Sequence, residues 1–155
     1  TWEVLTMEAG ASLFMIAMPL SFTNWPEKYW LKFDDHFVRA YTNPPVWDHD
    51  TWVANYLGHP YQGAVFYNSM RSQNASFLLS TGNVLFHTWL WEYGIEALME
   101  QPSIQDLIVT PLAGVFFGEL FHYLTLKFAK NGFTTWEKAA IICFNPCYAI
   151  NNGFK

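Results

Sequence analysis

The stretch that most constrains this fold is LIVTPLAGVFFGELFHYLTL, residues 107–126. It is apolar over about the 20 residues that a membrane-spanning helix needs. Glu119 and His122 lie inside it, and each would cost a few kcal/mol if its side chain faced lipid. Gly114 and Gly118, in GVFFG, would let a second helix approach closely. The stretch therefore predicts a core helix of a bundle, with the polar groups facing protein, in preference to a plain membrane span.

The rest of the chain also has a helical pattern, because it lacks sustained polar–apolar alternation and an Asn-Gly hairpin between alternating segments. Ser103 with Asp106, and Thr134 with Glu137, are typical of helix N-terminal caps. Gly132 is expected to end the preceding helix. We predict a single all-α domain over residues 1–155, a helical bundle around a central apolar helix at about 104–130. The predicted helices are 3–21, 27–41, 48–57, 60–72, 75–99, 104–130 and 135–149.

The composition limits where such a bundle can reside. Charged residues make up 14% of the chain and hydrophobic residues 52%, whereas a typical soluble domain is about 25% charged. Part of the surface is therefore expected to be covered by membrane lipid, by a protein partner or larger assembly, or by both. A net charge of −5 with 8 scattered Lys and Arg argues against nucleic acid. The chain begins without Met, which suggests a processed form or a fragment of a longer protein.

The first predicted helix, residues 3–21, is also expected to be covered by lipid or by protein. Its apolar residues surround most of the circumference, and Glu3 and Glu8 are its charged residues. A helix of this kind must be buried in protein or in lipid. We expect it to be peripheral, with an outer face that needs a cover. Four aromatic residues near its ends would suit a membrane interface: Trp2, Trp25, Tyr29 and Trp30.

A second unusual stretch, NYLGHPYQGAVFYNSMRS at residues 55–72, mixes aromatic and hydrogen-bonding residues. One interpretation is a site, with His59 as a catalytic group and Gln62, Asn68 and Arg71 as ligand-binding groups. The other is a set of polar side chains that pair with neighbouring helices, since buried polar groups need partners. The residues leave both interpretations open, and we favour the second.

Carboxylates downstream offer partners and alternative roles. Glu92 and Glu96 are four residues apart and share a helix face, so we predict that Arg71 pairs with one of them. Glu119 and His122 form a Glu-x-x-His pair, as in di-iron bundles, but that chemistry needs a second copy. We therefore predict no metal site and no cofactor.

The chain resembles a bacterial family known as domain of unknown function 3943. The elements that carry the resemblance are HPYQG, YNSMRS, WEY and PSIQDLI followed by GVFFGE, within Asn55 to about Glu119. The resemblance implies an exported, envelope-associated protein of Gram-negative bacteria, often with a barrel-like β region after this domain, and it brings no established activity. The residues that match the family's motifs are His59, Gln62, Asn68, Arg71, Glu92, Ser103, Asp106 and Glu119.

Two functions remain. The first is a non-enzymatic structural or assembly component of the cell envelope, on the periplasmic side of the outer membrane or within it, that contacts lipid and a protein partner. The alternative is an enzyme acting on an envelope lipid or glycan, with His59 and Glu92 as acid and base and Arg71 holding an anionic group. Asp106 and Glu119 are further catalytic candidates. An open cleft between these groups would favour the enzyme, and a closed, paired cluster would favour the structural component.

Overall fold

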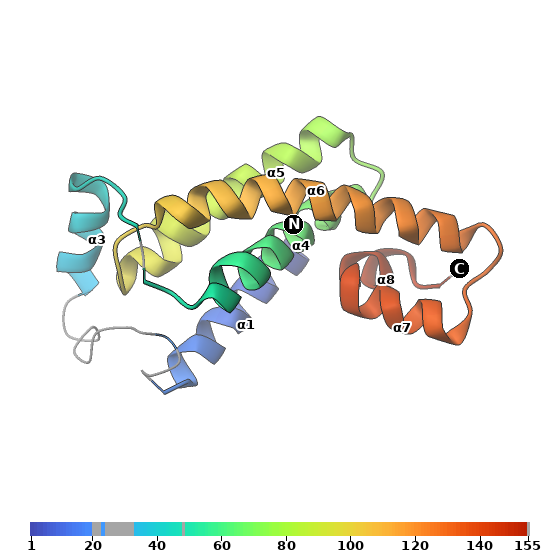
Figure 1. Ribbon diagram of the computed structural model, residues 1–155, viewed down its shortest axis with the longest axis horizontal. Helices are drawn as coiled ribbons and strands as arrows, with labels where there is room; N and C mark the ends of the chain where they lie inside the picture. Colours follow the sequence, from blue (N-terminus) through green and yellow to red (C-terminus); the bar gives the residue numbers. More distant parts are fainter. Residues whose placement is uncertain (20–22, 24–32, 48, 155) are drawn as a thin grey trace.

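The computed structural model describes residues 1–19, 23, 33–47 and 49–154, and the regular elements within them are all helical (Figure 1). An isolated parallel β-bridge joins Val46 to Ser103 and holds the segment around Val46 against the start of the longest helix. The all-α prediction is confirmed. The start of the expected helix 27–41 and the aromatics Trp25, Tyr29 and Trp30 lie outside the described residues. The elements are α1 (Trp2–Ala17), α3 (Phe33–Thr42), the π-helix η2 (Ala54–Gly58), α4 (His59–Arg71), α5 (Phe77–Leu90), the π-helix η3 (Trp91–Ile95), the 3₁₀-helix η4 (Glu96–Leu98), α6 (Ile104–Ala129), α7 (Thr135–Phe144) and α8 (Pro146–Asn152).

The centre of the fold is the crossing of α4 and α6, with α5 packed against both (Figure 1). Glycines make this crossing possible. A Cβ atom on Gly114 would lie 2.5 Å from the Cα atom of Gly63, and one on Gly118 would lie 2.7 Å from the Cβ atom of Tyr67. A Cβ on Gly63 would clash with the carbonyl oxygen of Thr110. The close helix contact predicted at Gly114 and Gly118 is thus confirmed.

The polarity of α6 is inverted relative to a helix on the surface of a water-soluble bundle. Its buried residues are Gln105, Asp106, Thr110, Pro111, Gly114, Gly118, His122 and Thr125. Its exposed side includes large apolar residues, among them Ile108, Leu112, Phe116, Leu120 and Tyr123. Only 28% of its most apolar window is buried, and α6 is the described helix long and apolar enough to cross a membrane. The core helix of a soluble protein can have the same length and composition.

The first helix has the peripheral position expected from the sequence. Within α1, Val4 and Glu8 are buried, whereas Leu13 and Phe14 are 68% and 53% exposed. The Glu8 carboxylate points inward, and its Oε1 lies 3.0 Å from Nδ1 of the buried His87 on α5. Here too an acidic group faces protein while an apolar side chain, Leu13, is largely exposed.

The helix-end signals predicted at Ser103, at Thr134 with Glu137 and at Gly132 are confirmed. The Ser103 hydroxyl accepts a hydrogen bond of 3.1 Å from the backbone N–H of Asp106. Thr134 and Glu137 form a reciprocal capping box at the start of α7. Gly132 follows α6 with a φ of 78°, which is the left-handed geometry that favours glycine.

Several predicted boundaries differ from the structure. The predicted helix 3–21 ends at Ala17, because Met18 has extended backbone geometry. The helix does not break at Gly58: the π turn η2 runs directly into α4, and Pro60 follows this wider turn. The predicted helix 75–99 changes at Trp91 into a π turn and then a 3₁₀ turn. The predicted helix 135–149 is interrupted at Asn145, whose φ of −140° precedes Pro146.

Candidate functional site

Two π-helical turns position the buried side chains of His59 and Glu92. The N–H of His59 bonds to the carbonyl of Ala54, five residues earlier, at the junction of η2 and α4. The N–H of Glu96 bonds in the same way to the carbonyl of Trp91 at the end of η3. Such widened turns occur frequently at functional sites. In this fold one precedes His59 and the other contains Glu92.

The resulting polar cluster consists of His59, Glu92 and Asp106. Their side chains come from α4, η3 and the first turn of α6, and the three residues are 8%, 1% and 2% exposed. One potential ligand atom from each lies within 4.8 Å of the other two. Nε2 of His59 is 3.5 Å from Oδ1 of Asp106. Oε2 of Glu92 accepts a hydrogen bond of 2.8 Å from the backbone N–H of Ser103.

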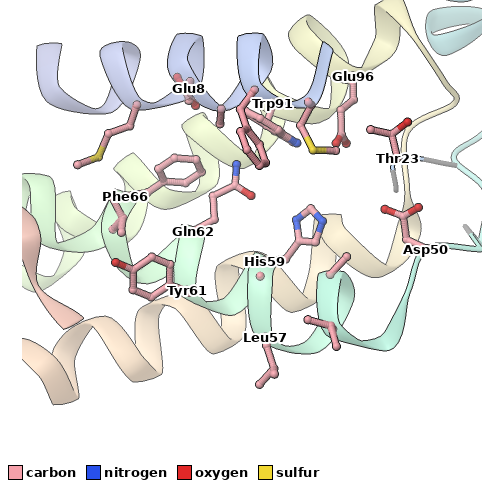
Figure 2. Close-up of a pocket in the computed structure, with 18 of the residues that line it drawn as sticks. Glu8, Thr23, Asp50, Leu57, His59, Tyr61, Gln62, Phe66, Trp91 and Glu96 are labelled. Carbon is pink, nitrogen blue, oxygen red and sulfur yellow. The ribbon is translucent and has the colours of Figure 1, made fainter. Parts of the chain in front are cut away.

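A pocket of about 910 Å³ borders this cluster. It lies between α1, the η2–α4 segment and the η3–η4 turn, and most of its lining is apolar. Figure 2 shows the imidazole of His59, the amide of Gln62 and the carboxylates of Asp50 and Glu96 pointing into it. His59 is therefore reached from the pocket, whereas Glu92 and Asp106 lie behind the lining.

The carboxyl of Glu96, which lines the pocket, has a raised pKa. Burial holds the pKa of its carboxyl well above the usual range, and the nearby charges of Glu92, Glu100 and Asp106 raise that pKa further. The neutral acid is consequently favoured at this position. A protonated carboxyl could donate a hydrogen bond to a ligand at the polar end of the pocket.

Arg71 and Glu119 lie away from this cluster. Arg71 ends α4, twelve residues after His59, or about 18 Å along the helix axis. Its Nε and Nη2 atoms donate hydrogen bonds of 3.0 and 3.2 Å to the two carboxylate oxygens of Glu119. The Tyr67 hydroxyl donates to the same carboxylate. The predicted pairing of Arg71 with Glu92 or Glu96 is therefore wrong, because Glu119 on α6 faces the end of α4.

The remaining candidate residues have separate positions. Asn68 is fully buried, and its Nδ2 donates hydrogen bonds of 3.1 Å to the carbonyl of Ala64 within α4 and to the carbonyl of Gly118 on α6. The second of these links the two helices. Gln62 faces the pocket. The structure thus brings together His59, Glu92 and Asp106, with Gln62 nearby, and separates them from Arg71 and Glu119.

Sequence reasoning missed the buried Glu8–His87 pair and the inward position of Asp50. Glu8 and His87 are 79 positions apart, so no local spacing relates them. A signal was present in the first helix, where Glu8 is an acidic residue among apolar ones. A lone charge of this kind needs a buried partner if its helix packs against others.

The fold and site define a class: an all-α protein with a polar interior, a largely apolar exterior and a buried carboxylate–imidazole cluster beside an apolar pocket. Residues 44–147, about two-thirds of the chain, match the family described as Domain of unknown function (DUF3943). The chain belongs to this family. No curated protein and no solved structure matches this chain.

Proposed function

We propose that this chain is a membrane-embedded helical component of the bacterial cell envelope, with a structural or assembly role and α5 and α6 in contact with lipid. The observation that carries the proposal is the inversion of polarity. Large apolar side chains face outward on both helices, while carboxylates, amides, hydroxyls and imidazoles face inward. In a lipid environment this arrangement is favourable, since polar groups must be satisfied inside the protein.

The outward face of α5 supports the same proposal. Phe77, Leu78, Leu79, Leu85, Phe86 and Trp89 are each between 47% and 80% exposed. The α5 helix carries no Asp, Glu, Lys or Arg. Soluble monomers rarely expose an apolar surface this continuous unless another molecule covers it.

Helix length and packing are also consistent with a bilayer. The 26 residues of α6 give a length of about 39 Å, enough to cross a hydrocarbon core of about 30 Å. Between Asp106 and Lys127, the charged residue of α6 is Glu119, which Arg71 neutralises. The glycine contact between α4 and α6 is typical of helix association in membranes, where small residues let backbones approach.

A flotation experiment tests the proposal. The purified chain, mixed with phospholipid vesicles and centrifuged in a density gradient, is expected to rise with the vesicles. Phe116→Glu places an acidic side chain on the exposed middle of α6. Burying this charge in lipid costs about 3 kcal/mol, so the variant is expected to partition into the vesicles roughly a hundredfold less than the parent. Asn131→Asp adds the same charge in an exposed turn and should float like the parent.

The other outcomes separate the competing explanations. A chain that stays below the vesicles as a homogeneous monomer would overturn the proposal. A chain that ignores vesicles but sediments as a defined assembly would show that protein covers the apolar surface. That result would support the protein partner that the composition led us to expect, in place of lipid.

The second candidate is an enzyme acting on an envelope lipid or glycan. The observation that favours it is the 910 Å³ pocket, whose apolar walls suit an acyl chain and whose polar end contains His59. His59 and Glu92 would act as acid and base without Arg71, which lies at the other end of α4. Mass spectrometry of an envelope lipid and glycan extract incubated with the protein tests this. Products that disappear with His59→Gln but persist with His122→Gln would favour the enzyme.

A further inference from the structure

We propose that His59, Glu92 and Asp106 form a binding site for one divalent transition-metal cation, with Zn²⁺ as the best match. Imidazole nitrogen and carboxylate oxygen are both zinc ligands, and three protein ligands with one open position are typical of reactive zinc centres. This inference does not depend on the proposed membrane function, because it rests on side chains in the interior.

The distance between two of these side chains is compatible with coordination of one shared metal ion. Nε2 of His59 and Oδ1 of Asp106 lie 3.5 Å apart, within ion-pair distance. Two ligands of a tetrahedral zinc ion, each about 2.1 Å from the metal, are separated by about 3.4 Å. The Glu92 oxygen completes a triangle in which all three atoms lie within 4.8 Å of one another.

The surroundings supply the orientation that metal ligands need. The backbone N–H of Ser103 binds Oε2 of Glu92 at 2.8 Å and so fixes that carboxylate. The Ser103 hydroxyl accepts a hydrogen bond from the backbone N–H of Asp106 and fixes the turn from which Asp106 projects. Outer-shell hydrogen bonds of this kind orient ligating carboxylates and tune metal affinity.

The pocket provides an access route and an open coordination position. His59 lines it, whereas Glu92 and Asp106 are almost fully buried behind it. A cation that enters through the pocket would meet the imidazole first and the two carboxylates beyond it.

The competing explanation is that Glu92 and Asp106 only stabilise the N-terminus of α6. Carboxylates are favourable there because the helix dipole and the N–H groups attract them. The Glu92→Gln variant separates the two roles. The amide oxygen of glutamine can still accept the hydrogen bond from Ser103, whereas the charged metal ligand is lost.

The test is a zinc titration of the chelator-treated, purified chain in competition with a chromophoric chelator. The expected result is saturable binding of one Zn²⁺ per chain, with Mg²⁺ and Ca²⁺ unable to displace it. His59→Gln and Glu92→Gln are each expected to weaken binding at least tenfold. The control is His122→Gln: this imidazole is also buried, and its Glu-x-x-His partner Glu119 is bound to Arg71. Binding in the control should equal that of the parent.

Zn²⁺ should also raise the melting temperature of the parent with increasing concentration, and at each concentration it should raise that of Glu92→Gln by less. Loss of binding in Glu92→Gln while its metal-free melting temperature stays that of the parent would support a metal role. Substoichiometric binding by the parent, or equal affinity in parent and Glu92→Gln, would overturn the site. If both ligand variants fail to fold, the parent and His122→Gln still decide, since stoichiometric zinc in both supports it and absence in the parent refutes it.

Discussion

Thr134 and Glu137 illustrate how individual residues set the helix ends. The N–H of Glu137 donates to the Thr134 hydroxyl, and the Glu137 carboxylate accepts from the N–H and the hydroxyl of Thr134. These hydrogen bonds hold the pKa of Glu137 below its usual value. Because the charged form is favoured in the folded state, its contribution to stability is present above the ordinary carboxyl range and is lost as the pH falls.

We predict that Glu137→Gln unfolds more easily than the parent at neutral pH and that this difference disappears in acid. Thr134→Ala should cost about 1 kcal/mol through loss of the cap, and Thr134→Ser should restore stability because it keeps the hydroxyl. Denaturant titrations followed by far-UV circular dichroism at several pH values measure this. A Glu137→Gln difference that is constant across pH would contradict the role of its charge.

At the scale of helices, the α4–α6 crossing depends on the absence of side chains at its centre. Gly63 and Gly114 meet backbone to backbone, so neither neighbour can move aside when a methyl group is added. Gly114→Ala is predicted to destabilise the fold by about 1–3 kcal/mol through overpacking. Gly82 is the matched control, because it lies within α5 and a Cβ there meets nothing within 4 Å.

Gly82→Ala should stabilise α5 by about 0.5–1 kcal/mol, as alanine is the better helix former. Thermal unfolding of Gly114→Ala and Gly82→Ala in the same detergent measures both changes in stability. Equal effects of the two substitutions would contradict a close contact between α4 and α6, whereas opposite signs are expected if the crossing is as tight as described.

Helix existence and several helix ends could be predicted from particular residues, but helix neighbours could not. Ser103, Thr134 and Gly132 give local signals, and their hydrogen bonds and backbone angles are local as well. Arg71 pairs with Glu119 because the crossing of α4 and α6 brings these two residues together. The spacing of residues within one helix does not determine where two helices cross. The π turns at η2 and η3, which aim His59 and Glu92, also lack a recognisable sequence pattern.

At the scale of the whole molecule, the distribution of polar and apolar side chains supports the proposed membrane location. Among the residues that the structure describes, thirteen buried ones are hydrophobic, and carboxylates, imidazoles, amides and hydroxyls occupy much of the remaining interior. The exposed apolar side chains extend over α1, α5 and α6. A lipid environment accounts for both observations at once, since it favours an apolar exterior and penalises polar groups that face outward.

Depth-dependent fluorescence in vesicles tests this central claim most directly. An environment-sensitive dye would be attached to single cysteines at Leu112, Phe116 or Asn131 in a Cys143→Ser background. The remaining Cys147 is buried, and burial raises the pKa of its thiol to about 12, so it should react little. Dyes at 112 and 116 are predicted to show blue-shifted emission that quenchers on lipid chains suppress, and the dye at 131 to report water. Water-like, unquenched emission at 112 and 116 would contradict the membrane-embedded account.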